Sequence, residues 1–175
     1  MKANRAEIER ALDAPPPHIR VFLLYGPDEA ESRGLAQRLE RAMGPEAERI
    51  DLDGATLKSD PARLADEAAS ISLFGGKRHI RLSVVGDECL SAIEGLLDAE
   101  AAGNPVVILA GALRPTSALL KRALADPAAM ACISYALDAE KAAPLAAAMA
   151  RELGVRLDMD AARQLAQAAA NDRAL

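Results

Sequence analysis

Val106-Val107-Ile108-Leu109-Ala110 is the stretch of sequence that decides the fold. It is short, apolar throughout and rich in β-branched side chains, which is typical of a strand covered on both faces in a parallel sheet. A similar run over 19–25 ends at Gly26-Pro27, which predicts a buried strand followed by a turn. Parallel strands need long crossover connections, so we expect helices between such strands.

Strand and helix signals alternate outward from these two runs. Three further strands are expected, over residues 49–52, 78–85 and 131–135. Four helices are expected between the strands, over residues 28–43, 60–70, 88–102 and 116–125. Asp60 and Thr116 are the expected capping residues of the second and fourth of these helices. Residues 1–138 therefore predict a three-layer α/β domain with a five-stranded parallel sheet.

From residue 139 onward the sequence becomes Ala-rich and helical in pattern. One helix is expected to run to Leu153, where Gly154 closes it. Asp158 or Asp160 is expected to cap a second helix that ends near residues 171–173. Two short helices bury little apolar surface by themselves, so residues 139–175 are interpreted as the first part of a truncated helical second domain.

Composition argues against several functional classes. The 175 residues carry a net charge of −5, and only 2% of them are aromatic. Base stacking needs exposed rings and phosphate binding favours a basic surface, so a nucleic-acid-binding module is a poor match. No apolar run approaches the roughly 20 residues of a membrane-spanning helix. Cys89 and Cys132 are too far apart for metal-site or disulfide spacing, so we expect a reduced, cytoplasmic protein without a metal.

The turn at Gly26-Pro27 lies where a phosphate-binding loop would follow the first strand. Such a loop places a second glycine, a lysine and a hydroxyl at fixed offsets, which fall here on Glu31, Ser32 and Arg33. The acidic side chains that begin the next helix would also repel phosphate oxygens, by roughly 1 kcal/mol each near a surface. The residues at this turn therefore do not match a phosphate-binding loop.

The strand over 106–110 fails a second requirement of ATP hydrolysis. An ATPase places a magnesium-binding acid at the end of such a strand, but this one runs into Gly111-Ala112. We therefore expect no catalytic activity and no cofactor. The alternative, an atypical nucleotide-binding ATPase module, rests only on the strand–Gly–Pro–helix start. Direct DNA binding through Lys77-Arg78 and Lys121-Arg122 is a third interpretation, which the acidic net charge weakens.

The most unusual stretch is Ser70-Ile71-Ser72-Leu73-Phe74-Gly75-Gly76-Lys77-Arg78. Two large apolar residues, Leu73 and Phe74, stand directly before two glycines. Either these side chains fold back into the core, or they project as an anchor for a partner. The pattern alone favours the core.

The chain resembles the N-terminal part of the delta subunits of bacterial DNA polymerase III clamp loaders. The most specific match is Ser72-Leu73-Phe74 with the basic residue that follows it. The residues that carry the resemblance are 21–29, Leu52-Asp53-Gly54, 60–64, 72–78 and Asn171-Asp172-Arg173. Members of this family are longer, and their last domain forms the collar of a multi-subunit assembly.

The resemblance implies an AAA+-type fold that has lost ATP binding, in agreement with the two requirements that fail. It implies a non-catalytic accessory subunit that binds the sliding clamp (the beta subunit) through Leu73 and Phe74, flanked by Ser72 and Gly75. Binding would help to open the clamp for loading onto primed DNA, and burial of the two anchors would supply about 3–6 kcal/mol. Other clamp-loader subunits would bind a C-terminal domain absent from this sequence, and primed DNA would be contacted only in the assembled complex.

Overall fold

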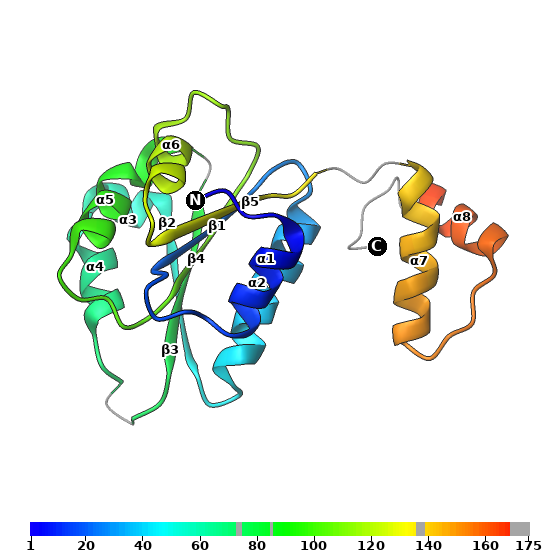
Figure 1. Ribbon diagram of the computed structural model, residues 1–175, viewed down its shortest axis with the longest axis horizontal. Coiled ribbons are helices and arrows are strands. Elements are labelled where there is room, and N and C mark those ends of the chain that lie inside the picture. Colours follow the sequence, from blue (N-terminus) through cyan, green and yellow to red (C-terminus); the bar gives the residue numbers. More distant parts are fainter. Residues whose placement is uncertain (73–74, 85, 136–138, 169–175) are drawn as a thin grey trace. The chain divides into compact units, whose positions relative to one another are not determined.

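The computed structural model describes residues 1–72, 75–84, 86–135 and 139–168 (Figure 1). The chain divides into two compact units, Met1–Ser134 and Tyr135–Leu175. The interpretation of 1–138 as a domain without a phosphate-binding loop, and of 139–175 as part of a larger helical domain, stays a prediction.

The first unit is built on a five-stranded sheet whose strands are all parallel and lie in the order β2-β3-β4-β1-β5. The strands are β1 (Val21–Tyr25), β2 (Glu48–Asp53), β3 (Arg78–Val84), β4 (Val106–Ala110) and β5 (Ala129–Ile133). The two most apolar strands, β1 and β4, lie side by side in the interior of the sheet. Strand β1 also pairs with β5. The predicted five-stranded parallel α/β architecture is confirmed.

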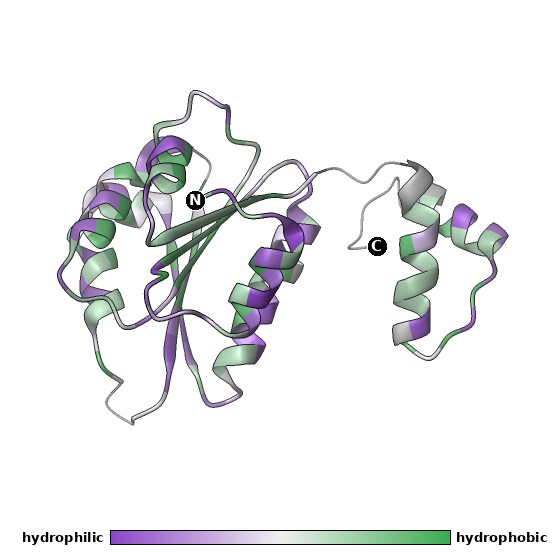
Figure 2. Cartoon of the chain, viewed as in Figure 1, coloured by the Kyte–Doolittle hydropathy of each residue, from purple (hydrophilic) through white to green (hydrophobic). Residues whose placement is uncertain are grey.

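Helices cover both faces of this sheet, as Figure 1 shows. One face carries α1 (Arg5–Asp13) and α2 (Glu29–Met43). The other face carries α3 (Gly54–Ser59), α4 (Ala62–Ala69), α5 (Leu90–Asp98) and α6 (Ala118–Ala125), with a short 3-10 turn, η1 (Asp87–Cys89), before α5. The first unit therefore forms three layers, with the apolar strands in the middle layer (Figure 2).

Alternation of side chains along β1 divides the interior into two cores. Val21, Leu23 and Tyr25 pack in the core beneath α3–α6, whereas Phe22 and Leu24 pack in the core beneath α1 and α2. All five residues are buried, because successive side chains of a strand point to opposite faces and both faces are covered. Burial on both faces of the sheet explains why the apolar run of β1 is unbroken.

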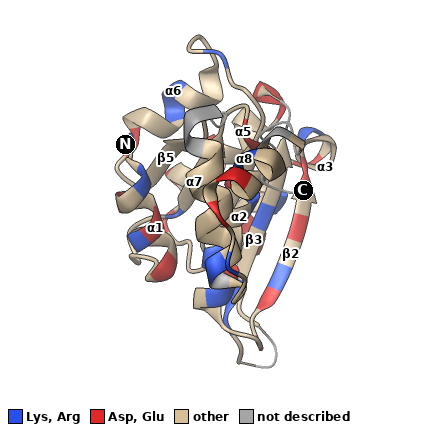
Figure 3. Cartoon of the chain, turned by 90° about the vertical axis from the view of Figure 1, so that its right-hand side faces the viewer, with Lys and Arg blue, Asp and Glu red and all other residues tan. Residues whose placement is uncertain are grey.

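The two edges of the sheet are protected in different ways. Strand β2 carries three acidic residues and Arg49 along the exposed edge (Figure 3), and Asp51 pairs there with Arg49 and Arg81. Charges on an edge strand discourage pairing with another chain. At the opposite edge, Lys2 forms a parallel bridge with Ala131 of β5, so the chain start covers that edge.

Two helices of the first unit were not expected from the sequence. Helix α1 begins with a capping box in which the Asn4 side chain accepts from Glu7 N and the Glu7 side chain accepts from Asn4 N. Helix α3 begins where Asp53 Oδ1 accepts a hydrogen bond from Thr56 N at 2.7 Å. Helix α3 has only six residues, so its cap is the main sequence signal, whereas α1 also places the buried Ile8, Ala11 and Leu12 at helical spacing.

Several expected boundaries are wrong by a few residues. Asp60 ends α3 and does not cap α4, which begins after Pro61 without a side-chain cap. The cap of α6 is Ser117, one residue after the expected Thr116, because the Ser117 hydroxyl accepts from Leu120 N and donates to Asp87. Strand β5 begins at Ala129, two residues earlier than expected.

The second unit contains α7 (Ala139–Glu152) and α8 (Met159–Ala168). Gly154 follows α7 with a φ of 76°, as the predicted helix stop requires. Of the two candidate caps for α8 it is Asp158 that serves, since its Oδ1 accepts from Ala161 N at 2.8 Å. The expected end of this helix near residues 171–173 lies outside the described residues.

Candidate functional site

The candidate site is the loop over 71–77, which joins α4 to β3 and which we call the α4–β3 loop. It lies at the end of the sheet where the parallel strands begin, at the bottom of the first unit in Figure 1. Leu73 and Phe74, the two expected anchors, lie outside the described residues. Their assignment therefore stays a prediction, and the described residues around them provide the geometry.

The two glycines of the α4–β3 loop have different backbone roles. Gly75 has a φ of 72°, a left-handed conformation that favours glycine, and its N–H donates to Ser72 O at 3.1 Å. A Cβ at Gly76 would lie 3.3 Å from Glu46 O, so the chain passes close to the segment before β2. This hydrogen bond links Ser72 and Gly75, the described residues that flank positions 73 and 74 in the sequence.

Ile71 is an exposed apolar residue that the sequence interpretation missed. It is 88% exposed, although it follows the buried Ala68 by three residues and helical spacing would place it in the core. The helix ends first, because Ser70 adopts an extended backbone with φ −70° and ψ 150°. The mismatch between the helical pattern and the helix end is the signal that could have identified Ile71.

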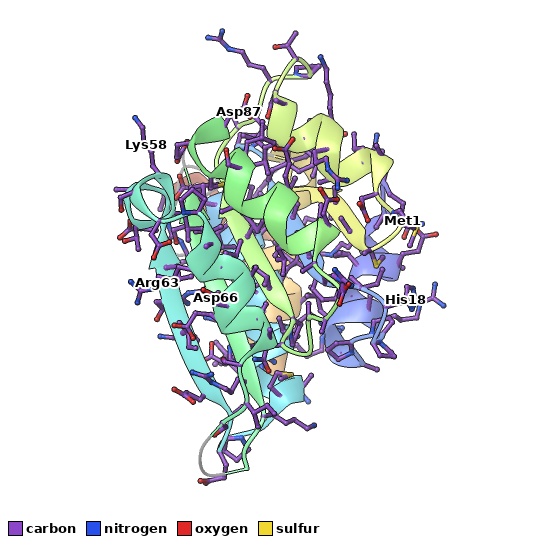
Figure 4. The ribbon with its side chains drawn as sticks, turned by 90° about the vertical axis from the view of Figure 1, so that its left-hand side faces the viewer. Met1, His18, Lys58, Arg63, Asp66 and Asp87 are labelled. Atoms are coloured by element: carbon purple, nitrogen blue, oxygen red, sulfur yellow. The ribbon has the colours of Figure 1, made fainter. Side chains whose placement is uncertain are left out.

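The outer face of α3 and α4 is polar up to this point. Lys58, Arg63 and Asp66 are exposed and lie on the outward side of the two helices in Figure 4. Ile71, where the α4–β3 loop starts, is the first large apolar side chain exposed after these helices among the described residues.

Arg78 connects the two ends of the α4–β3 loop. Its Nη1 donates to Ser70 Oγ, at the end of α4. Its Nε lies 2.9 Å from Glu48 Oε2 on β2, and its Nη2 lies 3.5 Å from Glu67 Oε2 on α4. One guanidinium thus joins α4 and β2 to its own strand, β3, and its side chain is only 13% exposed.

Asn104 holds the end of α4 from a second direction. Its Nδ2 donates to Glu67 O at 3.0 Å and to Ser70 O at 2.7 Å. The N–H groups of Gly103 and Asn104 both donate to Ala68 O. These bonds satisfy carbonyls that a helix end leaves without an intrahelical partner, so the point at which the chain leaves α4 is fixed.

The residues at the phosphate-loop positions lie near the other end of the sheet, where the parallel strands finish. Ser32, at the lysine position, is buried and donates from Oγ to Ser134 Oγ at 2.8 Å. Glu31, at the second glycine position, is ion-paired with Arg5 of α1. Arg33, at the hydroxyl position, pairs with Glu29 at 2.6 Å. None of the three supplies the group that a phosphate would require there.

The turn after β1 is itself filled by protein. A Cβ added at Gly26 would lie 2.0 Å from Ser134 O, so the backbone that follows β5 sits directly against this turn. A small cleft of about 220 Å³ remains at the ends of β3 and β4. Its lining comes from the first two turns of α2 and from these strand ends: Glu29, Ser32, Arg33, Ser83, Val84, Leu109, Ala110 and Gly111. It is smaller than most ligand pockets.

The remaining candidate residues are isolated or buried. Cys89 lies at the start of α5, but burial raises the pKa of its thiol to about 12 and outweighs any effect of the helix start. Cys132 is also a buried free thiol. His79 is buried, whereas His18 is exposed. Among the residues that the structure describes, no three His, Cys, Asp or Glu side chains are placed to hold a metal ion.

The two basic pairs and the helix lengths bear on direct DNA binding and on membrane insertion. Arg122 of the second basic pair is bound to Asp98 and Asp126 at 2.6 and 2.5 Å, as Arg78 of the first is bound to Glu48. Half of each basic pair is therefore already neutralised by acidic neighbours. Within the described part of the chain, no helix has the length and apolar character needed to cross a membrane.

Comparison with known proteins identifies the fold. Neither a protein-family model nor a curated protein matches this sequence. Among solved structures, the Bacillus subtilis DNA clamp loader delta protein matches with a TM-score of 0.61 and 16% identity, over 92% of this chain and 51% of that one. The chain has the AAA+-type fold. A Thermotoga maritima RuvB variant matches with a TM-score of 0.52 and 15% identity, over 94% of this chain and 53% of that one.

The likeness to these two proteins concerns the fold and not the function. At such identities the likeness shows the fold alone, because one fold carries many functions. The chain spans about half the length of the solved proteins that it matches.

Proposed function

We propose that this chain is a non-catalytic, clamp-loader-like subunit that binds a ring-shaped sliding clamp through the α4–β3 loop. Ile71, Leu73 and Phe74 are the apolar contacts. The observation that carries the proposal is Ile71, a large apolar side chain 88% exposed beside the two predicted anchors. Together with Leu73 and Phe74, Ile71 would supply a contiguous apolar contact of the kind that marks a partner-binding site.

The size of the contact suits a local anchor. Burying Leu73 and Phe74 contributes about 1.5–3 kcal/mol each, and Ile71 adds a similar amount if a pocket covers it. A few such residues commonly dominate an interface. Because binding shifts an equilibrium only through a difference in affinity, ring opening requires tighter binding to the relaxed, open clamp interface.

The proposed lack of catalysis is supported by the residues at the end of the sheet where β1 and β4 finish. Ser32 is used in a buried hydrogen bond with Ser134, and β4 leads into Gly111-Ala112. A phosphate-binding lysine and a magnesium-binding acid would be needed at these two places. The subunit would therefore act by binding, while other subunits hydrolyse ATP.

The remaining partners belong to the same proposal. Other clamp-loader subunits would assemble through a C-terminal domain outside this sequence. Primed DNA would be contacted only within the assembled complex, in keeping with the net charge of −5. The match to only 51% of the clamp loader delta protein is in line with this division of roles.

A binding titration tests the proposal. The chain and its Leu73→Ala/Phe74→Ala variant are titrated with the sliding clamp of the same organism by calorimetry. We expect the double variant to bind about 100-fold more weakly or not at all, as loss of roughly 3 kcal/mol or more requires. Leu153→Ala/Val155→Ala is the matched control, because these residues are 81% and 52% exposed in the second unit. Equal affinities of the wild type and the anchor variant would remove the assignment.

A further inference from the structure

Four residues form a polar cluster at the point where the α4–β3 loop leaves and rejoins the domain. We call it the Arg78 cluster, and it consists of Arg78, Glu48, Glu67 and Ser70. The guanidinium of Arg78 is flanked by Glu48 at 2.9 Å and by Glu67 at 3.5 Å. Ser70 Oγ accepts from Arg78 and donates to Glu67 O at 2.8 Å. Every member therefore contacts at least one other member of the cluster.

The Arg78 cluster ties three elements into one base for the loop. Glu67 belongs to α4, Glu48 to β2 and Arg78 to β3. Lys77 O accepts from Glu48 N at 2.9 Å, so the returning backbone is also joined to β2. Because Arg78 touches Ser70 directly, the first and last residues that flank the loop are held together by a single side chain.

A loop with fixed ends loses less conformational entropy when it binds a partner. The Arg78 cluster holds Ser70 and Arg78 at the two ends of the loop, and the hydrogen bond from Gly75 N to Ser72 O is a further restraint between two described residues. Preorganisation of this kind raises affinity without any new contact to the partner. The Arg78 cluster lies at the base of the loop and not at its apolar contacts.

We infer that Arg78 is a positioning residue for partner binding by the α4–β3 loop. This inference rests on the proposed function. Arg78 acts through the loop: it holds Ser70 against β3 and so sets the direction in which Ile71 and the residues after it leave the domain. Affinity for the clamp thus depends on a side chain that is only 13% exposed within its own domain.

The chemistry requires arginine at this position. The planar guanidinium presents several N–H donors in fixed directions, so it contacts two carboxylates and a hydroxyl at once. A lysine ammonium carries the same charge as a compact point and does not reproduce that fork. The neighbouring Lys77 has the same charge but is exposed.

The test compares Arg78→Gln with Arg81→Gln, both in the full chain. Arg81 is the matched control, because it lies on the same strand and forms a similar cross-strand pair, with Asp51 at 2.8 Å, away from the loop. Clamp affinity is measured by calorimetry and exchange of the Gly75 amide by NMR. We expect Arg78→Gln to weaken clamp binding about tenfold and to speed Gly75 exchange at least tenfold, while Arg81→Gln changes neither.

Two further variants keep the inference falsifiable. Arg78→Lys should recover only part of the affinity, and Ser70→Ala, which removes one hydroxyl, should lower affinity without unfolding the chain. If Arg78→Gln matches Arg81→Gln in both affinity and Gly75 exchange, or if Arg78→Lys restores both in full, Arg78 has no positioning role. Failure of the wild-type chain to bind the clamp would instead contradict the proposed function, and the exchange measurement would still test the Arg78 cluster.

Discussion

Ser32 Oγ donates a hydrogen bond to Ser134 Oγ at 2.8 Å, and the two residues are 102 positions apart in the chain. Ser32 belongs to the first turns of α2 and Ser134 follows β5, so the bond joins the two sides of the turn after β1. Both residues are buried, with exposed fractions of 3% and 0%. The place that a phosphate-binding loop gives to a lysine is therefore closed by a contact within the domain.

We expect Ser32→Lys to destabilise the first unit by about 3 kcal/mol or more. The substitution breaks the Ser32–Ser134 hydrogen bond and places an ammonium group at a position only 3% exposed, where desolvation of a charge is costly. Ser32→Ala should cost only about 1 kcal/mol, through the loss of one hydrogen bond. Urea unfolding measures both changes.

Arg33→Lys is the control for these variants. It keeps the charge of an exposed side chain that is paired with Glu29, so stability should change by less than about 0.5 kcal/mol. A Ser32→Lys variant as stable as the wild type would show that this position has room for a phosphate-binding lysine.

We expect no saturable binding of magnesium–ATP below about 1 mM. Glu31 and Arg33 are engaged with Arg5 and Glu29, and the cleft at the strand ends is only about 220 Å³. A pocket of at least roughly 300 Å³ is usual for a ligand of that size. Equilibrium titration with a fluorescent ATP analogue measures the affinity. Saturation in the micromolar range would favour the ATPase alternative over a purely binding role.

Stability should fall as the pH falls below about 6.5, in part because of His79. Burial lowers the pKa of His79, and the nearby charges of Glu40, Arg49, Asp51 and Arg81 act in opposing directions. Its Nδ1 has no hydrogen-bond partner among the described residues. The unfolded chain therefore binds the proton more readily, so stability is complete above the ordinary pKa of about 6.5 and is lost as pH falls through the lower folded value.

The contribution of His79 can be isolated with two variants. His79→Leu should lose less stability between pH 7.5 and pH 5.5 than the wild type, as measured by urea unfolding at both values. His18→Gln is the control, because it replaces the other histidine of the chain, whose side chain is exposed. An unchanged pH dependence in His79→Leu would contradict this assignment.

The sequence predicts the sheet better than it predicts the site. Strands β1 and β4 are buried on both faces, so their unbroken apolar runs identify them directly. The Ser32–Ser134 bond and the Arg78–Glu48 pair join residues far apart in the chain. Such contacts depend on the order and register of the strands, which local pattern does not determine.

Local sequence pattern also fails to predict which apolar side chains of the α4–β3 loop are exposed. The stretch from Ser70 to Arg78 is unusual in sequence, yet pattern alone places its apolar residues in the core. The exposure of Ile71 follows from the helix ending at Ala69, two residues before the position that the apolar spacing would bury. Helix ends are set by such local competition for carbonyl partners, in which Asn104 takes part from another segment.

Photo-crosslinking from position 74 tests the central claim most directly. Phe74 is replaced by benzoylphenylalanine, and the full chain is irradiated with the sliding clamp of the same organism. Tyr135, which is aromatic and 64% exposed, receives the same replacement as the control. We expect a covalent adduct with the clamp from position 74 and none from position 135. No adduct from position 74 at clamp concentrations that saturate the wild-type chain would contradict the account.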